Sequence, residues 1–141
     1  MSVSIGQRTL GRTGFRVGEI GLGFEHLRRQ KPETIAAVVS EALENEINYF
    51  DLVWSLPNVL RGVKIGINGR RERVRIAVHL GSGHKNGRYL RSRKADECKR
   101  FFDDALSNLG TDYADVANIH YVKDLGTWKQ VNDGGVVDLA C

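Results

Sequence analysis

Apolar and polar residues follow one another along the chain in a pattern that predicts four strand–helix units. Short apolar runs, of the length typical of buried strands, are found at residues 19–23, 47–50, 74–80 and 113–119. Apolar residues at helical spacing follow the strands, most clearly in the third unit, where they are Cys98, Phe101, Phe102, Ala105, Leu106 and Leu109. Strands that alternate with helices favour an α/β fold with a parallel sheet and right-handed crossovers.

Turn residues set the expected boundaries of these elements. Residues 8–17 predict a short hairpin around a glycine-bearing turn, ahead of the first strand. The helix expected at 57–67 is weakened by Gly62 and Gly66, each of which costs about 1 kcal/mol in a helix interior. The polar, glycine-rich segment 81–87 is interpreted as a loop. It lacks the Gly-Lys-Ser/Thr ending of a P-loop, so we assign it no phosphate-binding role.

Three further residues are expected to mark helix ends. Asn45 suits the left-handed conformation that terminates the first helix, and Gly110 suits the same role after the third. Ser92 is the expected N-cap of the third helix, because its hydroxyl can accept a hydrogen bond from a free backbone N–H.

Four polar side chains are found at or just after the ends of the predicted strands. Asp51 ends the second strand, His79 lies near the end of the third, and His120 follows the fourth, while His26 lies just beyond the first. Parallel strands present their C-terminal ends at one edge of a sheet, where ligands and catalytic groups collect. We therefore expect the four side chains to share a pocket. The pattern predicts a site without specifying its chemistry.

Composition and charge describe an ordinary soluble chain of one domain. Of its 141 residues, 41% are apolar and 27% charged, and no run is long enough to span a membrane. The net charge of +4 comes partly from arginine clusters near residues 70–73 and 88–94. They lack the aromatic interleaving typical of single-strand-binding proteins, so we expect no nucleic-acid partner. Two cysteines make no disulfide framework, which favours a cytoplasmic location.

Three stretches resemble the aldo-keto reductase family. They are residues 10–23, which look like the family's opening hairpin and first strand, 46–51, similar to its second-strand motif, and 109–120, similar to its fourth-strand motif. The resemblance covers the whole chain but only the first half of the family's eight-unit barrel. It implies the N-terminal half of a TIM (β/α)8 barrel preceded by a short β-hairpin. Residues 1–141 would then form a single partial domain, truncated at its C-terminus.

The resemblance assigns roles residue by residue. Asp51 matches the family's catalytic Asp and His120 its catalytic His, whereas Leu56 occupies the position of the catalytic Tyr and His79 that of the Lys. In the family, the Tyr protonates the substrate carbonyl and the Lys lowers the pKa of that Tyr. Leu56 can do neither. The implied catalytic residues are Asp51, His79 and His120, and the implied cofactor-binding residues are Gly23, Phe24 and Asp51.

A divergent branch of the family, in which a ferredoxin-like iron–sulphur module follows the barrel, is more similar still. The matching stretches are 51–57, 79–82, 86–89 and 119–122. Members of that branch also lack the Tyr. The clustered cysteines of such a module are not in this sequence, so an iron–sulphur cluster is expected only if a further C-terminal region exists.

The first hypothesis for function is an oxidoreductase that transfers a hydride between NADP or NAD and a small carbonyl substrate. His120 would orient the substrate oxygen, Asp51 would orient a neighbouring ionisable group, and His79 or His120 would carry the proton. Because the family holds most of its cofactor through later strands, the chain alone is expected to be inactive.

Two alternatives remain open. The first is a metal-dependent hydrolase on a similar barrel, with the three histidines and Asp51 as zinc or iron ligands. The usual pair of histidines one residue apart on a strand does not occur, so we assign no metal ligands. The second is a non-enzymatic partial barrel that binds a partner. A partial barrel has unpaired strand edges, and its apolar sheet faces lack an opposite layer, so we expect a homodimer. The apolar residues concerned are Ile20, Leu22, Ile47, Phe50, Ile76, Val78, Val116 and Ile119.

Overall fold

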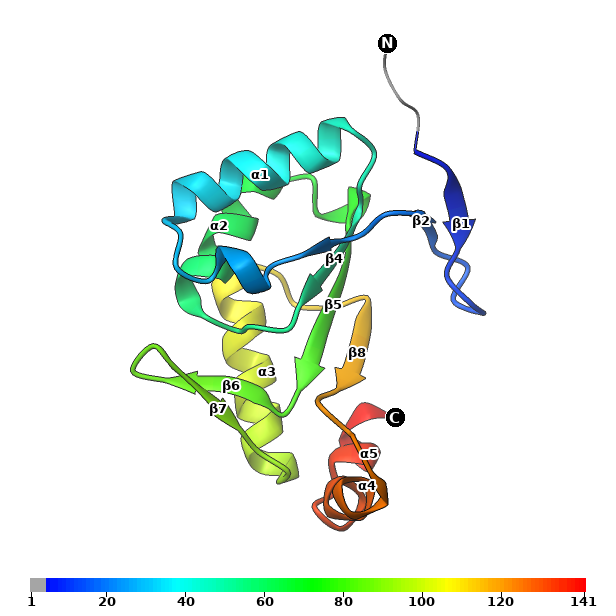
Figure 1. Ribbon diagram of the computed structural model, residues 1–141, viewed down its shortest axis with the longest axis vertical. Coiled ribbons are helices and arrows are strands. Elements are labelled where there is room, and N and C mark those ends of the chain that lie inside the picture. Colours follow the sequence, from blue (N-terminus) through cyan, green and yellow to red (C-terminus); the bar gives the residue numbers. More distant parts are fainter. Residues whose placement is uncertain (1–4) are drawn as a thin grey trace.

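The computed structural model describes residues 5–141, and its centre is a four-stranded parallel sheet (Figure 1). The strands lie in the order β3 (Leu22–Gly23), β4 (Tyr49–Leu52), β5 (Arg75–Leu80) and β8 (Val116–Ile119). The α-helices are α1 (Pro32–Glu44), α2 (Pro57–Ile67), α3 (Ala95–Leu109), α4 (Leu125–Asp133) and α5 (Val136–Ala140). Short 3-10 helices are η1 (Glu25–Leu27) and η2 (Arg71–Arg73). The predicted α/β fold of successive parallel units is confirmed.

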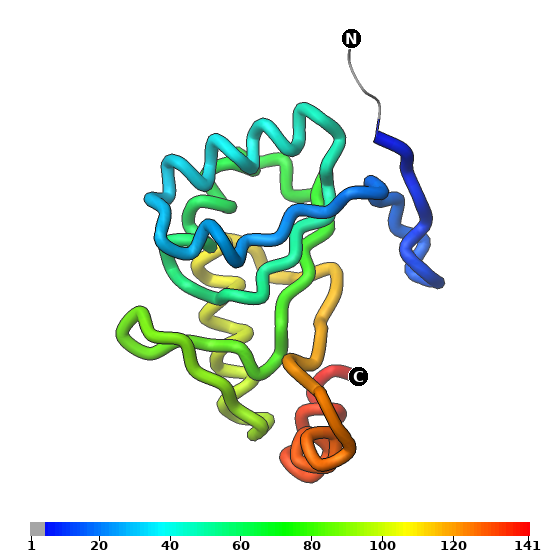
Figure 2. The backbone as a smooth tube through the Cα atoms, in the orientation of Figure 1, coloured from blue at the N-terminus to red at the C-terminus, as the bar shows by residue number. Residues whose placement is uncertain are grey.

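The path of the chain is easiest to follow in the backbone tube (Figure 2). The predicted N-terminal hairpin is confirmed as β1 (Gln7–Thr9) paired antiparallel with β2 (Arg16–Gly18). It lies beside the sheet, away from the helices, while the C-terminus lies next to β8 (Figure 2). Within residues 5–141, no helix combines the length and apolar character needed to cross a membrane.

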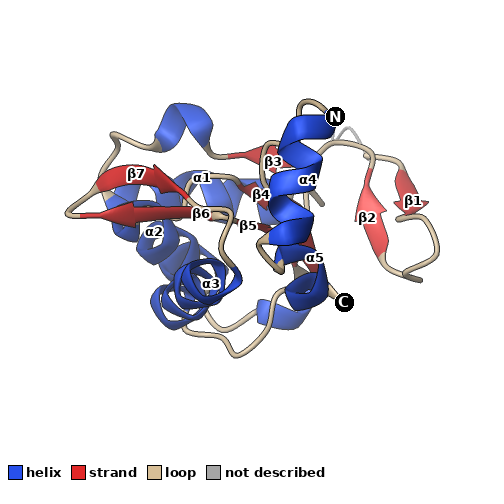
Figure 3. Cartoon of the chain, turned by 90° about the horizontal axis from the view of Figure 1, so that it is seen from below, coloured by secondary structure: helices blue, strands red, loops and turns tan. Residues whose placement is uncertain are grey.

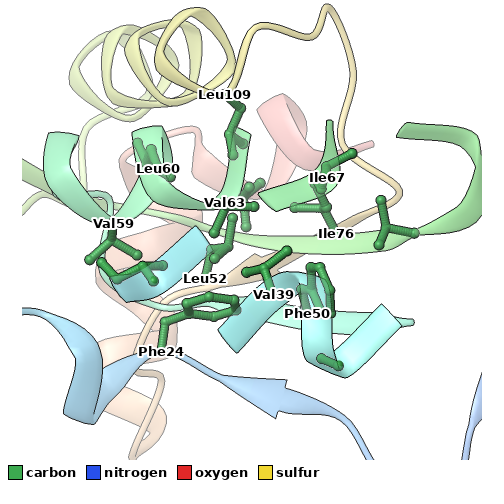
Figure 4. Close-up of a cluster of buried hydrophobic side chains, with 14 of the residues drawn as sticks. Phe24, Val39, Phe50, Leu52, Val59, Leu60, Val63, Ile67, Ile76 and Leu109 are labelled. Carbon is green, nitrogen blue, oxygen red and sulfur yellow. The ribbon is translucent and has the colours of Figure 1, made fainter. Parts of the chain in front are cut away.

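Helices α1, α2 and α3 cover one face of the sheet, and the main core lies between them (Figures 1 and 4). Side chains alternate along the strands, so Phe50, Ile76 and Val78 point beneath these helices and are at most 3% exposed. The expectation that these three would lack an opposite layer is therefore wrong. The other face of β4 and β5 carries Asp51 and His79. These polar side chains are accommodated there because the helices pack on the opposite face.

Close approach of α1 and α2 explains two glycines that weaken α2 locally. A Cβ added to Gly62 would lie 2.6 Å from the Cβ of Ile35, and one added to Gly66 would lie 2.5 Å from the Cβ of Val39. Real Cβ atoms do not approach this closely. The helix forms over the predicted residues because tertiary packing of its apolar face outweighs the propensity cost.

Several boundaries differ from the sequence predictions. The first strand is confined to Leu22–Gly23, and Asp51 lies within β4 instead of ending it. The left-handed residue after α1 is Glu46 (φ 61°), not Asn45 (φ −102°). The N-cap of α3 is Lys94 and not Ser92, so the helix begins two residues later than expected. The Ser92 hydroxyl accepts a hydrogen bond from the Lys94 N–H, ahead of the helix. Gly110 ends α3 in the left-handed conformation, as predicted.

The segment after β5 is a hairpin and not the loop expected from its glycines. Strand β6 (Ser82–Lys85) pairs antiparallel with β7 (Arg88–Arg91) across a two-residue turn. Both turn residues have positive φ, 52° at Asn86 and 73° at Gly87, which is the Asn-Gly signature of a tight hairpin. Seen from the ends of β5 and β8, this hairpin lies on one side of the sheet and α4 on the other (Figure 3).

Candidate active site

The predicted site residues on β4, β5 and β8 meet at one edge of the sheet. Asp51 is paired in register with Ala77, two residues before His79, and His79 is paired with Asn118, two residues before His120. Residues two apart share a face of a strand, so all three side chains lie on the face that the helices leave uncovered.

These three side chains form a hydrogen-bonded series. The Nε2 atom of His79 lies 2.7 Å from Oδ1 of Asp51, and its Nδ1 lies 3.2 Å from Nδ1 of His120. The two imidazole rings meet edge to face, with centroids 5.3 Å apart. The predicted convergence of Asp51, His79 and His120 is confirmed as geometry.

A fourth member of the series, Tyr89, was not found from the sequence. Its hydroxyl oxygen lies 2.6 Å from Nε2 of His120, and its ring packs edge-on against Trp54 with centroids 4.7 Å apart. The side chain comes from β7, which the sequence analysis took to lie beyond a polar loop. The Asn86-Gly87 dipeptide was the available signal, because it predicts a hairpin whose second strand begins at the next residue.

One arrangement of protons, with both rings neutral, satisfies the contacts that His79 and His120 make with Asp51, with Tyr89 and with each other. An ionised Asp51 can only accept, so His79 carries its proton on Nε2 and offers a lone pair at Nδ1. His120 then donates from its own Nδ1, which leaves its Nε2 to accept the hydroxyl proton of Tyr89. All three donations run in the same sense, from Tyr89 towards Asp51.

Burial keeps His120 uncharged. It is 6% exposed, and this desolvation lowers its pKa from 6.5 to about 4. Repulsion from His79, Arg91 and Arg93 acts in the same direction, whereas Asp51 opposes it. Arg93 also holds the backbone here, because its guanidinium donates to the carbonyl oxygens of His120 and Tyr121. His120 is therefore a neutral imidazole at neutral pH in a fixed position.

The residues expected to bind the cofactor have different surroundings. Gly23 is exposed beside Asp51 in the sheet, and a Cβ added to it would meet open space. Phe24 is fully buried in the core, where its ring packs edge to face on Phe50 with centroids 5.8 Å apart. Its side chain has no surface left for a cofactor. Only the Phe24 backbone is left for the predicted cofactor contact.

His26 does not join the other three strand-end residues. It is exposed in η1 and lines a surface hollow with Glu25 and Trp54, and it makes no hydrogen bond to the Asp51–His79–His120 series. Within residues 5–141, no three His, Cys, Asp or Glu side chains are grouped as metal ligands. The four-ligand set of the hydrolase hypothesis is thus not assembled.

A cleft of about 280 Å³ lies beside Tyr89 and Trp54, and its other lining residues are Arg28, Arg29, Leu56 and Gly87. The guanidinium of Arg28 lies over the Trp54 ring, 5.4 Å from its centroid. The indole N–H of Trp54 is buried and has no partner among the described residues. The larger cleft of about 730 Å³, between α2 and α3, adjoins Gly110 at the other end of β5 and is remote from this chemistry.

No protein-family model matches the chain, and no curated protein sequence matches it. Solved structures do. A Pseudomonas aeruginosa protein assigned as an aldo-keto reductase superposes with a TM-score of 0.76 over 94% of this chain, at 21% identity. An aldo-keto reductase from Bacillus halodurans in its holo form gives 0.73 over 96% of the chain at 22% identity, and one from Brucella melitensis gives 0.65 over 97% at 21%.

The chain spans about half the length of these proteins, which it covers to 52%, 48% and 49%. At this level of identity the likeness defines the fold. The molecule is a parallel α/β chain with the architecture of one half of an aldo-keto reductase barrel, as the motifs in its sequence predict.

Proposed function

We propose that the chain is an aldo-keto reductase-like oxidoreductase half barrel, which transfers a hydride between a nicotinamide cofactor and a small carbonyl substrate. The observation that carries the proposal is the continuous Asp51–His79–His120 series at the sheet edge where reductases of this fold do their chemistry. The barrel fold shared with aldo-keto reductases supports it.

In this proposal each member of the series fixes the next. Asp51 sets the tautomer of His79, and His79 in turn leaves His120 with its proton on Nδ1. His79 occupies the position where the family has a lysine, so an imidazole replaces an ammonium group beside Asp51. Leu56, at the position of the family tyrosine, is the N-cap residue just before α2 and packs partly buried against the core. It offers no proton.

The residues beside the series suit a nicotinamide dinucleotide. Exposed Arg28 and Arg29, which line the cleft beside Trp54, can attract phosphate. When bound, the dinucleotide (NADP or NAD) supplies or accepts the hydride. Most of the family's cofactor contacts come from strands beyond this half barrel. We therefore expect weak binding and no turnover by the 141-residue chain alone.

The test is a backbone NMR titration of the chain with NADP⁺ and NAD⁺, with AMP as a control that lacks nicotinamide. The proposal predicts dissociation constants in the millimolar range, with amide shifts concentrated at Gly23, Asp51 and His120 for both dinucleotides. AMP should leave these three amides unmoved. If neither dinucleotide moves them, or if AMP moves them equally, the nicotinamide proposal is refuted. Saturation at micromolar concentration would contradict the expectation that the cofactor site is incomplete.

A further inference from the structure

The hairpin that carries Tyr89 is a fixed part of the site. The Ser82 hydroxyl donates to the Val53 carbonyl oxygen over 2.6 Å, and the Ser92 N–H donates to the Gly81 carbonyl oxygen over 3.0 Å. Strand β6 lies so close to α3 that a Cβ added to Gly83 would overlap the Phe101 ring. These contacts, together with the tight Asn-Gly turn, hold β7 in place. The β6–β7 hairpin therefore holds the Tyr89 hydroxyl in a fixed position beside His120.

The surroundings of that hydroxyl are those of a group that exchanges protons. His120 accepts from it at 2.6 Å, and the Arg91 Nε–H donates to its oxygen at 3.2 Å. A cation that donates to a phenol oxygen stabilises negative charge there when the proton leaves. Tyr89 is only half-buried, and it lines the same cleft as Leu56 and the unpartnered Trp54 indole. A substrate that enters this cleft contacts the Tyr89 side chain.

We propose that Tyr89 is a catalytic residue that exchanges a proton with the substrate oxygen, and that His120, His79 and Asp51 carry this proton to and from solvent. The proposal rests on the oxidoreductase function above, and it gives this chain a proton donor in place of the tyrosine that Leu56 replaces. The Asp51 side chain is 45% exposed, so the series has one end in the cleft and the other in water.

The step balances in both directions. In alcohol oxidation, the hydride leaves the carbinol carbon for an oxidised nicotinamide, and the substrate hydroxyl proton passes to the Tyr89 oxygen. Tyr89 gives its own proton to Nε2 of His120, His120 gives one from Nδ1 to His79, and His79 gives one from Nε2 to Asp51. The alcohol loses two electrons and becomes a carbonyl, the nicotinamide is reduced, and Asp51 releases a proton to water. Carbonyl reduction is the reverse, starting with Asp51 protonated, His79 protonated on Nδ1 and His120 protonated on Nε2.

The resting order of donors favours proton removal from the substrate. With Asp51 ionised, every hydrogen bond already points from Tyr89 towards solvent, so alcohol oxidation needs no prior rearrangement. A neutral, buried His120 does not store the proton, which instead passes through it. The substrate class that this order suits is a small alcohol paired with an oxidised nicotinamide.

The experiment uses ¹⁵N NMR of the histidine rings in the 141-residue chain and requires no cofactor. The wild-type chain should show His120 protonated at Nδ1 and His79 at Nε2. Tyr89→Phe keeps the ring against Trp54 but removes the hydroxyl donor, so the midpoint of His120 titration should rise by roughly half to one pH unit. Tyr113→Phe, which alters an exposed tyrosine outside the series, should leave it unchanged.

A second measurement tests contact with the substrate. Trifluoroethanol at millimolar concentration serves as the alcohol probe, observed by ¹⁹F NMR. Its protein-induced shift should be lost in Tyr89→Phe and kept in Tyr113→Phe. A His120 proton on Nε2 in the wild-type chain, an unchanged titration in Tyr89→Phe, or an undiminished ¹⁹F shift would each overturn the proposal. If these results hold while NADP⁺ and NAD⁺ fail to bind, the nicotinamide function fails and the proton series stands.

Discussion

Lowering the pH from about 7.5 to about 4.5 is expected to weaken the fold through one buried side chain, His120. The unfolded chain takes up a proton at this imidazole below its ordinary pKa of 6.5, whereas the folded chain does so only near pH 4. The contribution to stability is therefore fully present above pH 6.5 and is lost as the pH falls towards 4, because protons bind the unfolded state first.

The size of the loss follows from the pKa difference. The full difference of about 2.5 pKa units corresponds to about 3 kcal/mol, and between the two chosen pH values most of it, about 2 to 3 kcal/mol, is expressed. Solvent screens this effect little, because the residue is 6% exposed. The groups facing the ring are His79 on β5, Tyr89 and Arg91 on β7, and Arg93, with Asp51 behind His79.

Urea unfolding at a series of pH values measures this directly. His120→Gln keeps a polar side chain but does not titrate in this range, so its loss of stability on acidification should be smaller than that of the wild-type chain by about 2 to 3 kcal/mol. His26→Gln removes an exposed histidine and should reproduce the wild-type slope. If His120→Gln and the wild-type chain lose the same free energy, the ring is not held neutral by the fold, and the reasoning is wrong.

Two more outcomes follow from packing and from the sheet edges. Gly66→Ala should lower the free energy of unfolding by about 1 to 3 kcal/mol, because its Cβ would lie 2.5 Å from that of Val39. Gly126→Ala, at an exposed position in α4, should be neutral or stabilising. If urea unfolding shows equal effects for the two variants, the close-packing explanation is refuted. The chain should also self-associate, because β3 and β8 are the edges of the described sheet; sedimentation at monomer mass across the micromolar range would contradict this.

The meeting of Asp51, His79 and His120 could be predicted from the sequence because it depends only on topology. Parallel strands end at one edge of a sheet, so residues near those ends converge even when the strand boundaries are wrong by two or three positions. The same reasoning wrongly placed His26 in the site, because β3 is only two residues long and η1 begins two residues after it ends. His26 therefore lies in η1, and its side chain does not contact the Asp51–His79–His120 series.

The remaining errors come from interactions between segments that local patterns do not contain. Gly62 and Gly66 are unfavourable in an isolated helix, and only the position of α1 shows that no larger residue fits. Whether Phe50 faces the helices or the barrel interior depends on which face the helices cover, which alternation along one strand does not decide. Tyr89 became part of the site only because a hairpin packed on α3 turns it towards His120.

In the proposed mechanism, Tyr89 takes the part that a tyrosine at residue 56 would have. In such a site the proton donor must touch the substrate oxygen and must connect to a group that restores its proton. Leu56 lies in the loop after β4, whereas the hairpin after β5 places a phenol beside Leu56 in the same cleft. Its hydroxyl contacts His120, the residue that matches the family histidine, so the connection to Asp51 is kept although both the tyrosine and the lysine positions have changed. Every group in this path lies between residues 51 and 120, whereas most cofactor contacts of the family lie in later strands. In the proposed mechanism, proton transfer therefore needs only groups present in this chain, so the proton series can be studied in this chain by itself.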